Sequence, residues 1–585
     1  MSAHNPSPAI HLPAMPDAPP SSVPVARSRE FLEPFDRPMR TFILVCLLTI
    51  ACVDTARRFL PQLLRQDLFH VDACQHVWWT YRLADPKLFP NDPIADFMSL
   101  PIFAPPLYKA MYQVAVQVMD AQVFADLLPF LLSPLTWWLA WRLGRHAGGF
   151  VGACAAFLCL FYFETLPELG GGIARSFGLP MLMGGMLALF ERRLFALGAV
   201  FLVASLMYPP VVITLGVTTA IVLGIRLLKE KRLPTGWLSL CVLGMLAIGC
   251  IGLVHFKKLP PNVGPKVTGA QARTMEEFGE GGRSSFFLPS DQWKEFYFRR
   301  MRSSIDLSPI TFYVAVPVIL ITLIFLRRAV PWEGYVLLVS SACLFVVAHL
   351  VLFSLYLPNR QVVWSFPIFG MLWFAGIAKW VYDRLSSGNL GRRMLSSPVV
   401  RFVILAILVV KTGLITREGL QQTWKTYHDP AFMRTFWTST PDFDAGIGYL
   451  KSLPPDVKVA AFPLDADVIP MRALKSVLAN RETAMAYYLG FYRPIAEKLH
   501  AELAACYADN WADVDALYDR YGVRVFLVNA ERYRPKGSYI FSPFNQANRE
   551  RVKRNKGRFV LMNPPPDRVL FKSGDISVIR VGPKR

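Results

Sequence analysis

The sequence lacks most of the short motifs that identify soluble enzymes. Its nine cysteines form no CxxC pair and fall mostly within apolar stretches, so they are interpreted as small apolar side chains. Residues 417–585 contain neither GxGxxG nor GxxxxGK[ST], and a nucleotide site is not expected there. No basic stripe falls in a nucleic-acid motif, which argues against a nucleic-acid partner. No apolar run with a small-residue cleavage site precedes Thr41, so we expect no secretory signal peptide.

Apolar residues, by contrast, are abundant. The 585 residues are 53% hydrophobic and 13% aromatic, with a mean hydropathy of +0.33, and this composition is typical of a protein with several membrane spans. The formal charge of +21 suits a protein that lies on anionic lipid or handles phosphorylated substrates. Part of that charge reflects the ordinary excess of Lys and Arg in cytoplasmic loops.

Hydropathy divides the chain into three regions. Residues 1–38 are rich in Pro, Ser and Ala and are predicted to form a disordered cytoplasmic tail. Residues 39–416 form the predicted transmembrane domain, with about eleven helices near the length that a bilayer core requires. The predicted spans are 41–59, 123–141, 148–163, 176–191, 194–208, 211–228, 235–256, 309–326, 332–356, 362–382 and 399–416. Neither a solenoid period nor two matching halves is visible.

Positive charge gathers in alternate connections between these spans. This alternation predicts a cytoplasmic N-terminus and places both the first loop and residues 417–585 outside the cytoplasm. The loop 257–308 is basic although it is predicted to lie outside, which suggests a function for it. The connections that carry the alternating charge contain Arg142 and Arg145; Arg192 and Arg193; Lys229, Lys231 and Arg232; Arg327 and Arg328; Arg384, Arg392 and Arg393.

Residues 417–585 alternate helical and β-rich patterns, which predicts a compact extracytoplasmic α/β domain. The expected helices cover 442–453, 493–507 and 511–521. The expected strands cover 457–462, 476–479, 523–528 and 559–562, followed by a hairpin of 569–572 and 576–581.

The first outer loop, residues 66–96, carries the densest group of polar residues. On a helix, Asp72 and His76 would share one face because they are four residues apart. An idle carboxylate next to the membrane costs stability, so Asp72 is a candidate general base and His76 a candidate partner. His70 and Arg82 are further candidates in the same loop. The simpler interpretation is that acidic residues here are helix caps and turn formers, since Asp85-Pro86 and Asn91-Asp92-Pro93 are turn signals.

Three other outer segments hold polar residues that membrane packing does not require. Glu168, three consecutive glycines and Arg175 lie between the third and fourth spans, where glycine lets backbone amides approach an oxyanion. Arg283 follows Gly279-Glu-Gly-Gly in the basic loop, a candidate lid over a phosphate. Arg360 lies in the turn Leu357-Pro-Asn-Arg. Each segment has a simpler interpretation. The glycine-rich segment is then a flexible turn, the basic loop a solvated loop near headgroups, and Arg360 an arginine that only reaches toward the interface.

No cofactor is expected. His70-x-Asp72-x3-His76 offers three possible ligands for a divalent metal ion, but the spacing matches no specific metal-binding signature. In the alternative without a metal, His76 holds the carboxylate in place.

The layout resembles that of the GT-C superfamily of integral-membrane glycosyltransferases. The shared features are an acidic residue in the first outer loop, about a dozen spans, further polar outer loops and a soluble C-terminal domain outside. The stretches Asp72-Ala-Cys-Gln-His-Val-Trp-Trp, Gly171-Gly-Ile-Ala-Arg-Ser-Phe and Leu357-Pro-Asn-Arg also look similar to stretches in a group of bacterial multipass proteins. Family members often carry a paired acidic motif where this chain has Val71-Asp72, so the resemblance implies a base more directly than a metal.

The resemblance implies transfer of a sugar from a polyprenyl-phosphate carrier to a glycan, lipid or protein acceptor outside a bacterial inner membrane. Asp72 would accept the proton of the attacking hydroxyl, while Arg175, Arg283 and Arg360 would hold the phosphate. One base with direct attack predicts inversion at the anomeric carbon. Two alternatives stay open: a transporter or flippase, which would carry charges in mid-membrane, and a non-catalytic scaffold for envelope polysaccharide assembly.

Overall fold

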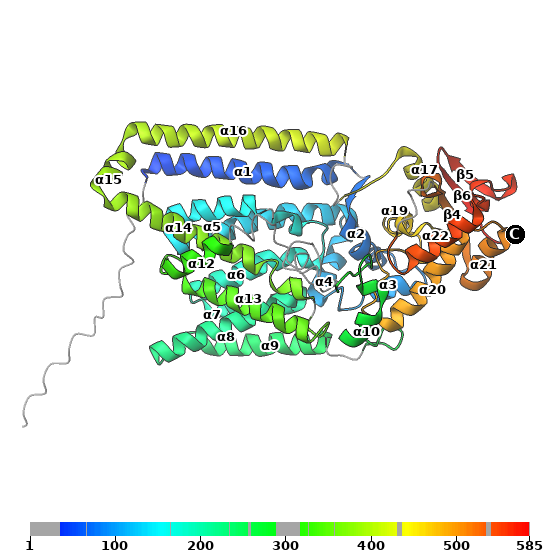
Figure 1. Cartoon of the computed structure of the whole chain (residues 1–585), viewed down its shortest axis with the longest axis horizontal. Helices are drawn as coiled ribbons and strands as arrows, with labels where there is room; N and C mark the ends of the chain where they lie inside the picture. Colours follow the sequence, from blue (N-terminus) through cyan, green and yellow to red (C-terminus); the bar gives the residue numbers. More distant parts are fainter. Residues whose placement is uncertain are drawn as a thin grey trace, which may run out of the picture.

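The computed structural model describes residues 35–65, 67–163, 165–232, 234–255, 259–287, 316–325, 327–355, 357–429, 436–533 and 540–583. A long helical bundle occupies one end of the molecule and a smaller mixed domain the other (Figure 1). By length and composition, six of the described helices are long and apolar enough to cross a membrane, and three shorter apolar helices accompany them. The expectation of a multi-pass helical protein with a small C-terminal sheet is confirmed.

The helices of the bundle overlap the predicted spans, but the described residues do not confirm the predicted count of about eleven membrane helices. Its helices are α1 (Arg37–Leu64), α5 (Ala121–Tyr162), α6 (Gly178–Phe190), α7 (Leu194–Met207), α8 (Pro210–Glu230), α9 (Trp237–His255), α12 (Val316–Phe325), α13 (Trp332–Leu350), α14 (Ser365–Ser387), α15 (Asn389–Ser396) and α16 (Pro398–His428). The predicted span 309–326 lies partly outside the described residues, which cover it from 316 to 325.

The 42-residue helix α5 covers two predicted spans and turns back on itself between them. Gly148 and Gly149 depart from helical φ/ψ, and a Cβ atom on Gly144 would lie only 2.5 Å from the Cβ of Ala156. Twelve residues of straight helix would instead separate these positions by about 18 Å. The two limbs of α5 are therefore antiparallel neighbours, and glycine at position 144 permits their close approach.

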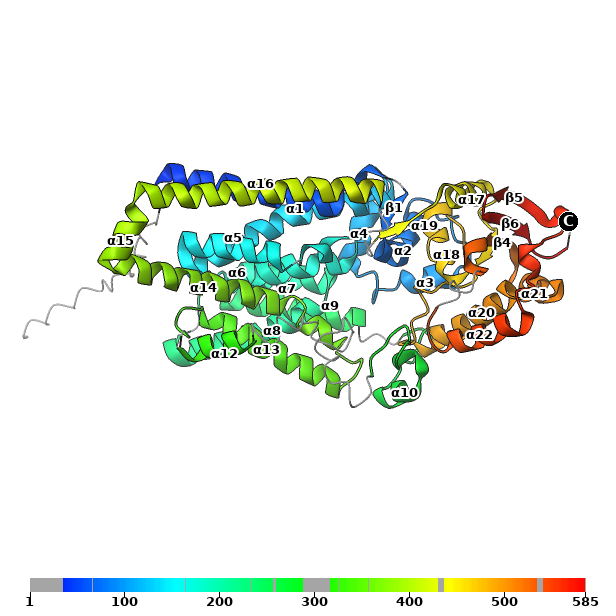
Figure 2. The same cartoon turned by 45° about the horizontal axis from the view of Figure 1, so that its top comes forward.

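Helix α16 runs beside α1 along the outside of the bundle (Figure 2). A Cβ on Gly419 would lie 2.3 Å from a methyl carbon of Val53, and Arg57 donates to the Gln422 side-chain oxygen at 2.7 Å. The helix continues to His428, beyond the predicted span 399–416. Residues 417–428 thus extend the helix rather than opening the α/β domain.

The C-terminal domain is built on a four-stranded sheet in the order β3-β4-β6-β5. β3 pairs with β4 in parallel, and the other neighbours are antiparallel. The strands are β3 (Lys458–Ala461), β4 (Val523–Asn529), β5 (Val569–Ser573) and β6 (Ile576–Arg580). The longest helices of the domain are α17 (Pro441–Ser452), α20 (Leu489–Cys506), α21 (Trp511–Tyr521) and α22 (Phe544–Asn555).

Two predicted strands of this domain were wrong. Residues 476–479 make only an isolated bridge, between Val477 and Val459, and residues 560–562 form one turn of 3₁₀ helix, η9 (Val560–Met562). Both segments are short apolar runs, whose burial is satisfied by several backbone conformations.

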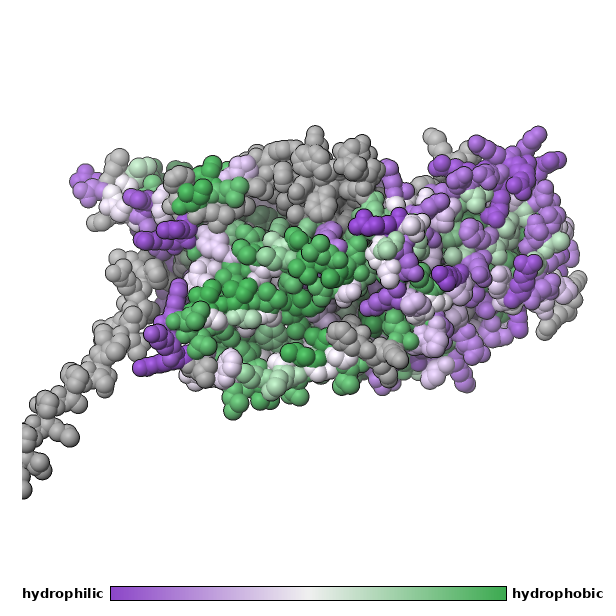
Figure 3. All heavy atoms as spheres, turned by 60° about the horizontal axis from the view of Figure 1, so that its bottom comes forward, coloured by the Kyte–Doolittle hydropathy of each residue, from purple (hydrophilic) through white to green (hydrophobic). Residues whose placement is uncertain are grey.

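The junction between bundle and domain is formed by segments far apart in the sequence. β1 (Leu68–His70), in the first outer loop, pairs antiparallel with β2 (Phe436–Thr438), which precedes the domain. The loop 259–287, which contains α10 (Gly269–Thr274), meets the start of α20, and Val267 N–H donates to the Tyr487 carbonyl at 3.0 Å. In the view of Figure 3, hydrophobic residues gather over the middle of the bundle and hydrophilic residues over the domain, so the junction lies where the surface changes from apolar to polar.

Candidate functional site

Asp72 is the second residue of α2 (Val71–His76), a short helix that directly follows β1. The Nδ1 atom of His70 accepts a hydrogen bond from Asp72 N–H at 3.2 Å and caps this helix. The His70 ring lies against the glycine-rich segment, because a Cβ on Gly171 would come within 2.8 Å of Nδ1 and one on Gly170 within 3.2 Å of the ring. His70 thus joins the first outer loop to the second.

This contact places the second loop's charged residues beside Asp72. Arg175 lies in η3 (Ala174–Phe177) and Glu168 in η2 (Leu166–Leu169), on either side of the three glycines. Arg175 Nη2 donates to Asp72 Oδ2 at 2.6 Å, and Arg175 Nε lies 3.2 Å from Glu168 Oε2. One guanidinium therefore bridges two carboxylates from different loops.

Arg360, which comes from the turn Leu357-Pro-Asn-Arg, faces the Glu168 carboxylate. It lies in η6 (Pro358–Gln361), and its Nη1 is 3.9 Å from Glu168 Oε2. Two contacts fix this turn: Thr214 donates to the Gln361 side-chain oxygen at 2.9 Å, and a Cβ on Gly178 would lie 2.3 Å from the ring of Trp364.

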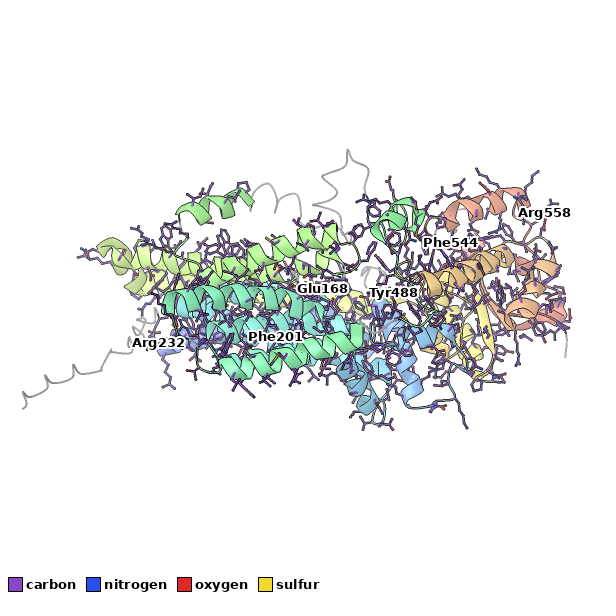
Figure 4. The ribbon with its side chains drawn as sticks, turned by 90° about the horizontal axis from the view of Figure 1, so that it is seen from below. Glu168, Phe201, Arg232, Tyr488, Phe544 and Arg558 are labelled. Atoms are coloured by element: carbon purple, nitrogen blue, oxygen red, sulfur yellow. The ribbon has the colours of Figure 1, made fainter. Side chains whose placement is uncertain are left out.

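Asp72, Glu168, Arg175 and Arg360 are called the outer charge cluster below. They come from three loops, and Glu168 lies at the end of the bundle nearest the C-terminal domain (Figure 4). Their side chains are 30%, 33%, 23% and 15% exposed, respectively. The cluster is balanced in charge, and its four side chains are partly exposed.

The electrostatics of α2 follow from these neighbours. Desolvation opposes the charge on Asp72, but Arg175, His70, His76 and Arg360 outweigh it and hold the pKa of this carboxyl below its usual range. Burial lowers the pKa of His76 to about 4, so this imidazole is neutral at physiological pH. Burial likewise lowers the pKa of His70, consistent with a neutral ring that accepts at Nδ1.

The third glycine of the loop has a packing role that can be tested. Gly172 has φ +60°, and a Cβ there would lie 2.5 Å from the Ala125 Cα. Its carbonyl accepts hydrogen bonds from Tyr108 and Tyr112 at 3.1 and 2.7 Å. We expect Gly172→Ala to lower the unfolding temperature in detergent, with about 1–2 kcal/mol lost to the left-handed backbone alone.

Gly184, in α6, is the matched control for this substitution. A Cβ there meets nothing within 4 Å, and alanine is the better helix former. Gly184→Ala should therefore leave the unfolding temperature unchanged or raise it slightly. An equal loss of stability in both variants would contradict the packing role of Gly172.

Arg283 lies in a second cluster, which also contacts α2. Its guanidinium contacts Glu482 Oε2 at 3.0 Å, and Arg481 binds the other oxygen of that carboxylate at 2.5 Å. Arg481 also contacts Asp467 at 3.1 Å, and the Glu482 carbonyl accepts from Gln75 of α2 at 2.8 Å. Arg283, Asp467, Arg481 and Glu482 are called the junction cluster.

The junction cluster ties the C-terminal domain to the helix that carries Asp72. Although desolvation favours its neutral form, Glu482 has a lowered pKa because of Arg283 and Arg481. Burial and the charge of Glu482 raise the pKa of Asp467. The pKa of His76 depends on charges of both clusters. Asp72 and Arg175 of the outer charge cluster act on it, and so do Glu482 and Arg283 of the junction cluster. The site thus includes residues of the domain that the sequence analysis did not single out. Their one signal was a charged pair, Arg481-Glu482, in the otherwise uncharged run 476–489.

Arg82 takes no part in either cluster. It lies in η1 (Trp78–Leu83) and donates to Asp96 at 2.6 Å and to the Leu88 and Phe89 carbonyls. The side chain therefore closes the turn that follows it. Asp92 caps α3 (Pro93–Met98) through the N–H groups of its second and third residues, at 2.8 and 3.2 Å, as the turn-forming alternative expected.

The donor set around Asp72 does not fit a divalent metal ion. Both Asp72 and Glu168 are already paired with the Arg175 guanidinium, and the His70 nitrogen nearest Asp72 accepts from a backbone amide. Within the described ranges, no group of three His, Cys, Asp or Glu side chains is placed to hold a metal ion. Arg175 occupies the position between the carboxylates that a cation would take.

Comparison with known proteins gives matches at the level of structure. Neither the family models nor the curated proteins give a match. Among solved structures, the chain is similar to the oligosaccharyltransferase AglB of Archaeoglobus fulgidus in complex with an inhibitory peptide and a dolichol-phosphate, with 11% identity, a TM-score of 0.43, and 85% of this chain and 70% of that chain covered. It is also similar to the Archaeoglobus fulgidus oligosaccharyltransferase in complex with Zn and sulfate, with 9% identity, a TM-score of 0.39, and coverage of 83% and 68%.

A third similar structure is the same archaeal enzyme tethered to an acceptor peptide that contains the NVT sequon. It has 11% identity and a TM-score of 0.41, with 84% of this chain and 69% of that chain covered. These neighbours are archaeal oligosaccharyltransferases. At this identity, residue roles are not transferred from them to this chain.

Proposed function

We propose that the chain is a membrane glycosyltransferase that moves a sugar from a polyprenyl-phosphate donor to an acceptor on the side of its C-terminal domain. The observation that carries this proposal is the outer charge cluster, in which Asp72, Arg175 and Arg360 converge from three separate loops. A carboxylate and two guanidinium groups beside a membrane surface are the components that displacement of a lipid-linked phosphate requires.

The arginines suit a phosphate ligand because carboxylate oxygens already contact each of them. Arg175 contacts Asp72 and Glu168, and Arg360 lies 3.9 Å from Glu168. A phosphate presents the same oxygens in the same fork geometry with more charge. On donor binding, the guanidinium of Arg175 turns from Asp72 toward the phosphate. The donor thereby takes the cation that holds the pKa of Asp72 low.

The loss of its contact with Arg175 makes the Asp72 carboxylate a stronger base. While paired with Arg175, Asp72 has a depressed pKa and little tendency to accept a proton. When the phosphate engages Arg175, desolvation by the surrounding loops is less opposed, and the pKa of Asp72 rises toward the working pH. The donor phosphate therefore activates the base, which ties proton acceptance to the presence of donor.

The proposed reaction is a single displacement. The acceptor hydroxyl loses its proton to a carboxylate oxygen of Asp72, and its oxygen bonds to the anomeric carbon. The bond from that carbon to the phosphate oxygen breaks, and the polyprenyl phosphate leaves with the electron pair, stabilised by Arg175 and Arg360. Attack from the face opposite the leaving group inverts the anomeric carbon. Metal chemistry forms no step of this scheme.

His76, Arg283 and Arg82 have less direct parts in the proposal. A neutral His76 can donate a hydrogen bond to the acceptor hydroxyl or accept one from it. For Arg283, phosphate binding stays a prediction, since a phosphate would have to replace Glu482. Arg82 is proposed to shape the loop that carries Asp72, because its donors contact that loop.

The proposal is tested with the purified chain in lipid nanodiscs and a panel of polyprenyl-phosphate sugars. Release of polyprenyl phosphate that depends on both sugar donor and acceptor supports a transferase, and the anomeric configuration of the product tests inversion. Movement of fluorescent carrier lipid between leaflets of liposomes, without sugar release, would instead establish a flippase. An envelope scaffold would show neither activity.

A further inference from the structure

A second charged feature lies at the opposite end of the bundle. A cavity of about 590 Å³ opens between the segment that joins α12 to α13 and the kink of α5. The joining segment lines it with Arg327 and Arg328, the first turn of α13 with Trp332 and Tyr335, and α5 with Ala147. Hydrophilic residues gather at this end of the bundle, away from the C-terminal domain (Figure 3).

The cavity has an uncompensated positive charge. Both Arg327 and Arg328 are exposed, and no Asp or Glu lines the cavity. In the part of the chain that the structure describes, neither arginine has an ion-pair partner. The nearest acidic side chain in sequence, Glu333, is bound to Arg226 at 2.8 Å, where both groups are about one-tenth exposed. Asp383, on the adjoining helix α14, is bound to Lys379.

The walls of the cavity have the character of a membrane interface. Trp332 and Tyr335 are half-buried, and the Trp332 ring is fixed from its face by Arg226 and Lys229, at 5.9 and 5.7 Å. Amphipathic aromatic rings of this kind sit at the headgroup level of a bilayer. The cavity therefore lies at the depth of lipid phosphates.

An apolar surface continues from the cavity along the two helices that flank it. On α13, Val339 and Val346 are 57% and 56% exposed, and on α12, Ile321 and Ile324 are 55% and 70% exposed. These side chains offer contact to acyl chains, whereas the two arginines offer contact to a phosphate. Together they match the two ends of one phospholipid.

We infer that this cavity binds an anionic phospholipid, with the headgroup phosphate between Arg327 and Arg328 and the acyl chains along α12 and α13. Guanidinium groups bind phosphate oxygens through paired hydrogen bonds. Because the buried Arg226–Glu333 pair joins α8 to α13 directly behind Trp332, the lipid would brace the packing of these helices. This inference is independent of the proposed transfer reaction.

The test compares two double variants of equal charge in nanodiscs of phosphatidylcholine, with and without phosphatidylglycerol. Arg327→Ala/Arg328→Ala removes the cavity cations. Lys231→Ala/Arg232→Ala removes two exposed cations from the same end of the bundle, where Figure 4 labels Arg232, but from outside the cavity. Native mass spectrometry measures the phosphatidylglycerol retained, and the unfolding temperature measures stabilisation by the lipid.

We expect the wild type to retain phosphatidylglycerol and to unfold at a higher temperature in its presence. The cavity variant should bind it about tenfold to thirtyfold more weakly, whereas the control variant should bind it like the wild type. Arg327→Lys/Arg328→Lys keeps the charge and should recover most of the binding, which separates lost binding from a failure to fold. Equal losses in both alanine variants would overturn the site, and so would normal retention in the cavity variant. Equal stabilisation by inorganic phosphate in detergent would assign the cavity to a soluble anion instead.

Discussion

Replacing Asp72 with Asn is expected to remove sugar transfer while leaving the protein folded and inserted. The substitution keeps the size of the side chain and its hydrogen bond from Arg175, but removes the group that accepts the proton. Loss of a general base typically lowers the rate by about 10²–10⁴-fold. The measurement is donor-dependent release of polyprenyl phosphate in nanodiscs, at saturating donor and acceptor.

Asp85→Asn is the matched control, because it removes a carboxylate from the same loop. Asp85 is exposed and accepts a hydrogen bond from Lys87 N–H at 2.9 Å, which an amide oxygen can also accept. Its activity should stay within a factor of about two of wild type, as expected for a surface substitution. Full activity in Asp72→Asn would rule out Asp72 as the base and with it the proposed mechanism.

Much of the bundle could be predicted because a membrane span is a local signal. Each apolar run of about twenty residues is recognisable without its neighbours, and the turn at Gly148-Gly149 was anticipated by the break between the spans 123–141 and 148–163. The C-terminal hairpin was equally local, since Ser573-Gly574-Asp575 connects two alternating runs. The structure of residues 476–479, which form an isolated bridge instead of a strand, was not local, because strand pairing depends on residues elsewhere in the chain.

For the candidate site, the sequence predicted only that its residues lie on the same side of the membrane. The alternation of charge placed Asp72, Glu168, Arg175 and Arg360 on one side of the membrane, and these four residues do come together. The Asp72–Arg175 contact itself depends on His70 packing against Gly170 and Gly171, a fit between two loops that composition does not encode.

No sequence pattern predicts the contacts within the junction cluster. Arg283 and Glu482 are separated by 199 residues, and no periodicity relates a basic loop to a turn in a distant domain. The pairing of β1 with β2 and the hydrogen bond from Val267 to Tyr487 help to bring these segments together. A buried carboxylate between two arginines follows from that tertiary arrangement.

Removing the Arg175 guanidinium should both slow transfer and change its dependence on pH. In the wild type, Arg175 helps to hold the pKa of Asp72 below its usual range, so Asp72 stays ionised throughout the ordinary range of pH. In Arg175→Gln, desolvation is opposed less strongly, and the pKa of Asp72 rises. The residual activity should therefore fall as the pH drops, beginning at a higher pH than in the wild type.

The expected size of the loss at high pH, where Asp72 is ionised in both proteins, is about 10²–10³-fold, because a cation that stabilises the departing phosphate is missing. The measurement is kcat/KM as a function of pH for wild type, Arg175→Gln and Arg493→Gln, an exposed arginine of α20 that belongs to neither cluster. Arg493→Gln should keep the wild-type profile. A rate loss in Arg175→Gln without a shifted acidic limb would mean that Arg175 binds phosphate but does not govern the base. A normal rate would separate Arg175 from the reaction altogether, and the exchange of one guanidinium between carboxylate and phosphate would have to be abandoned.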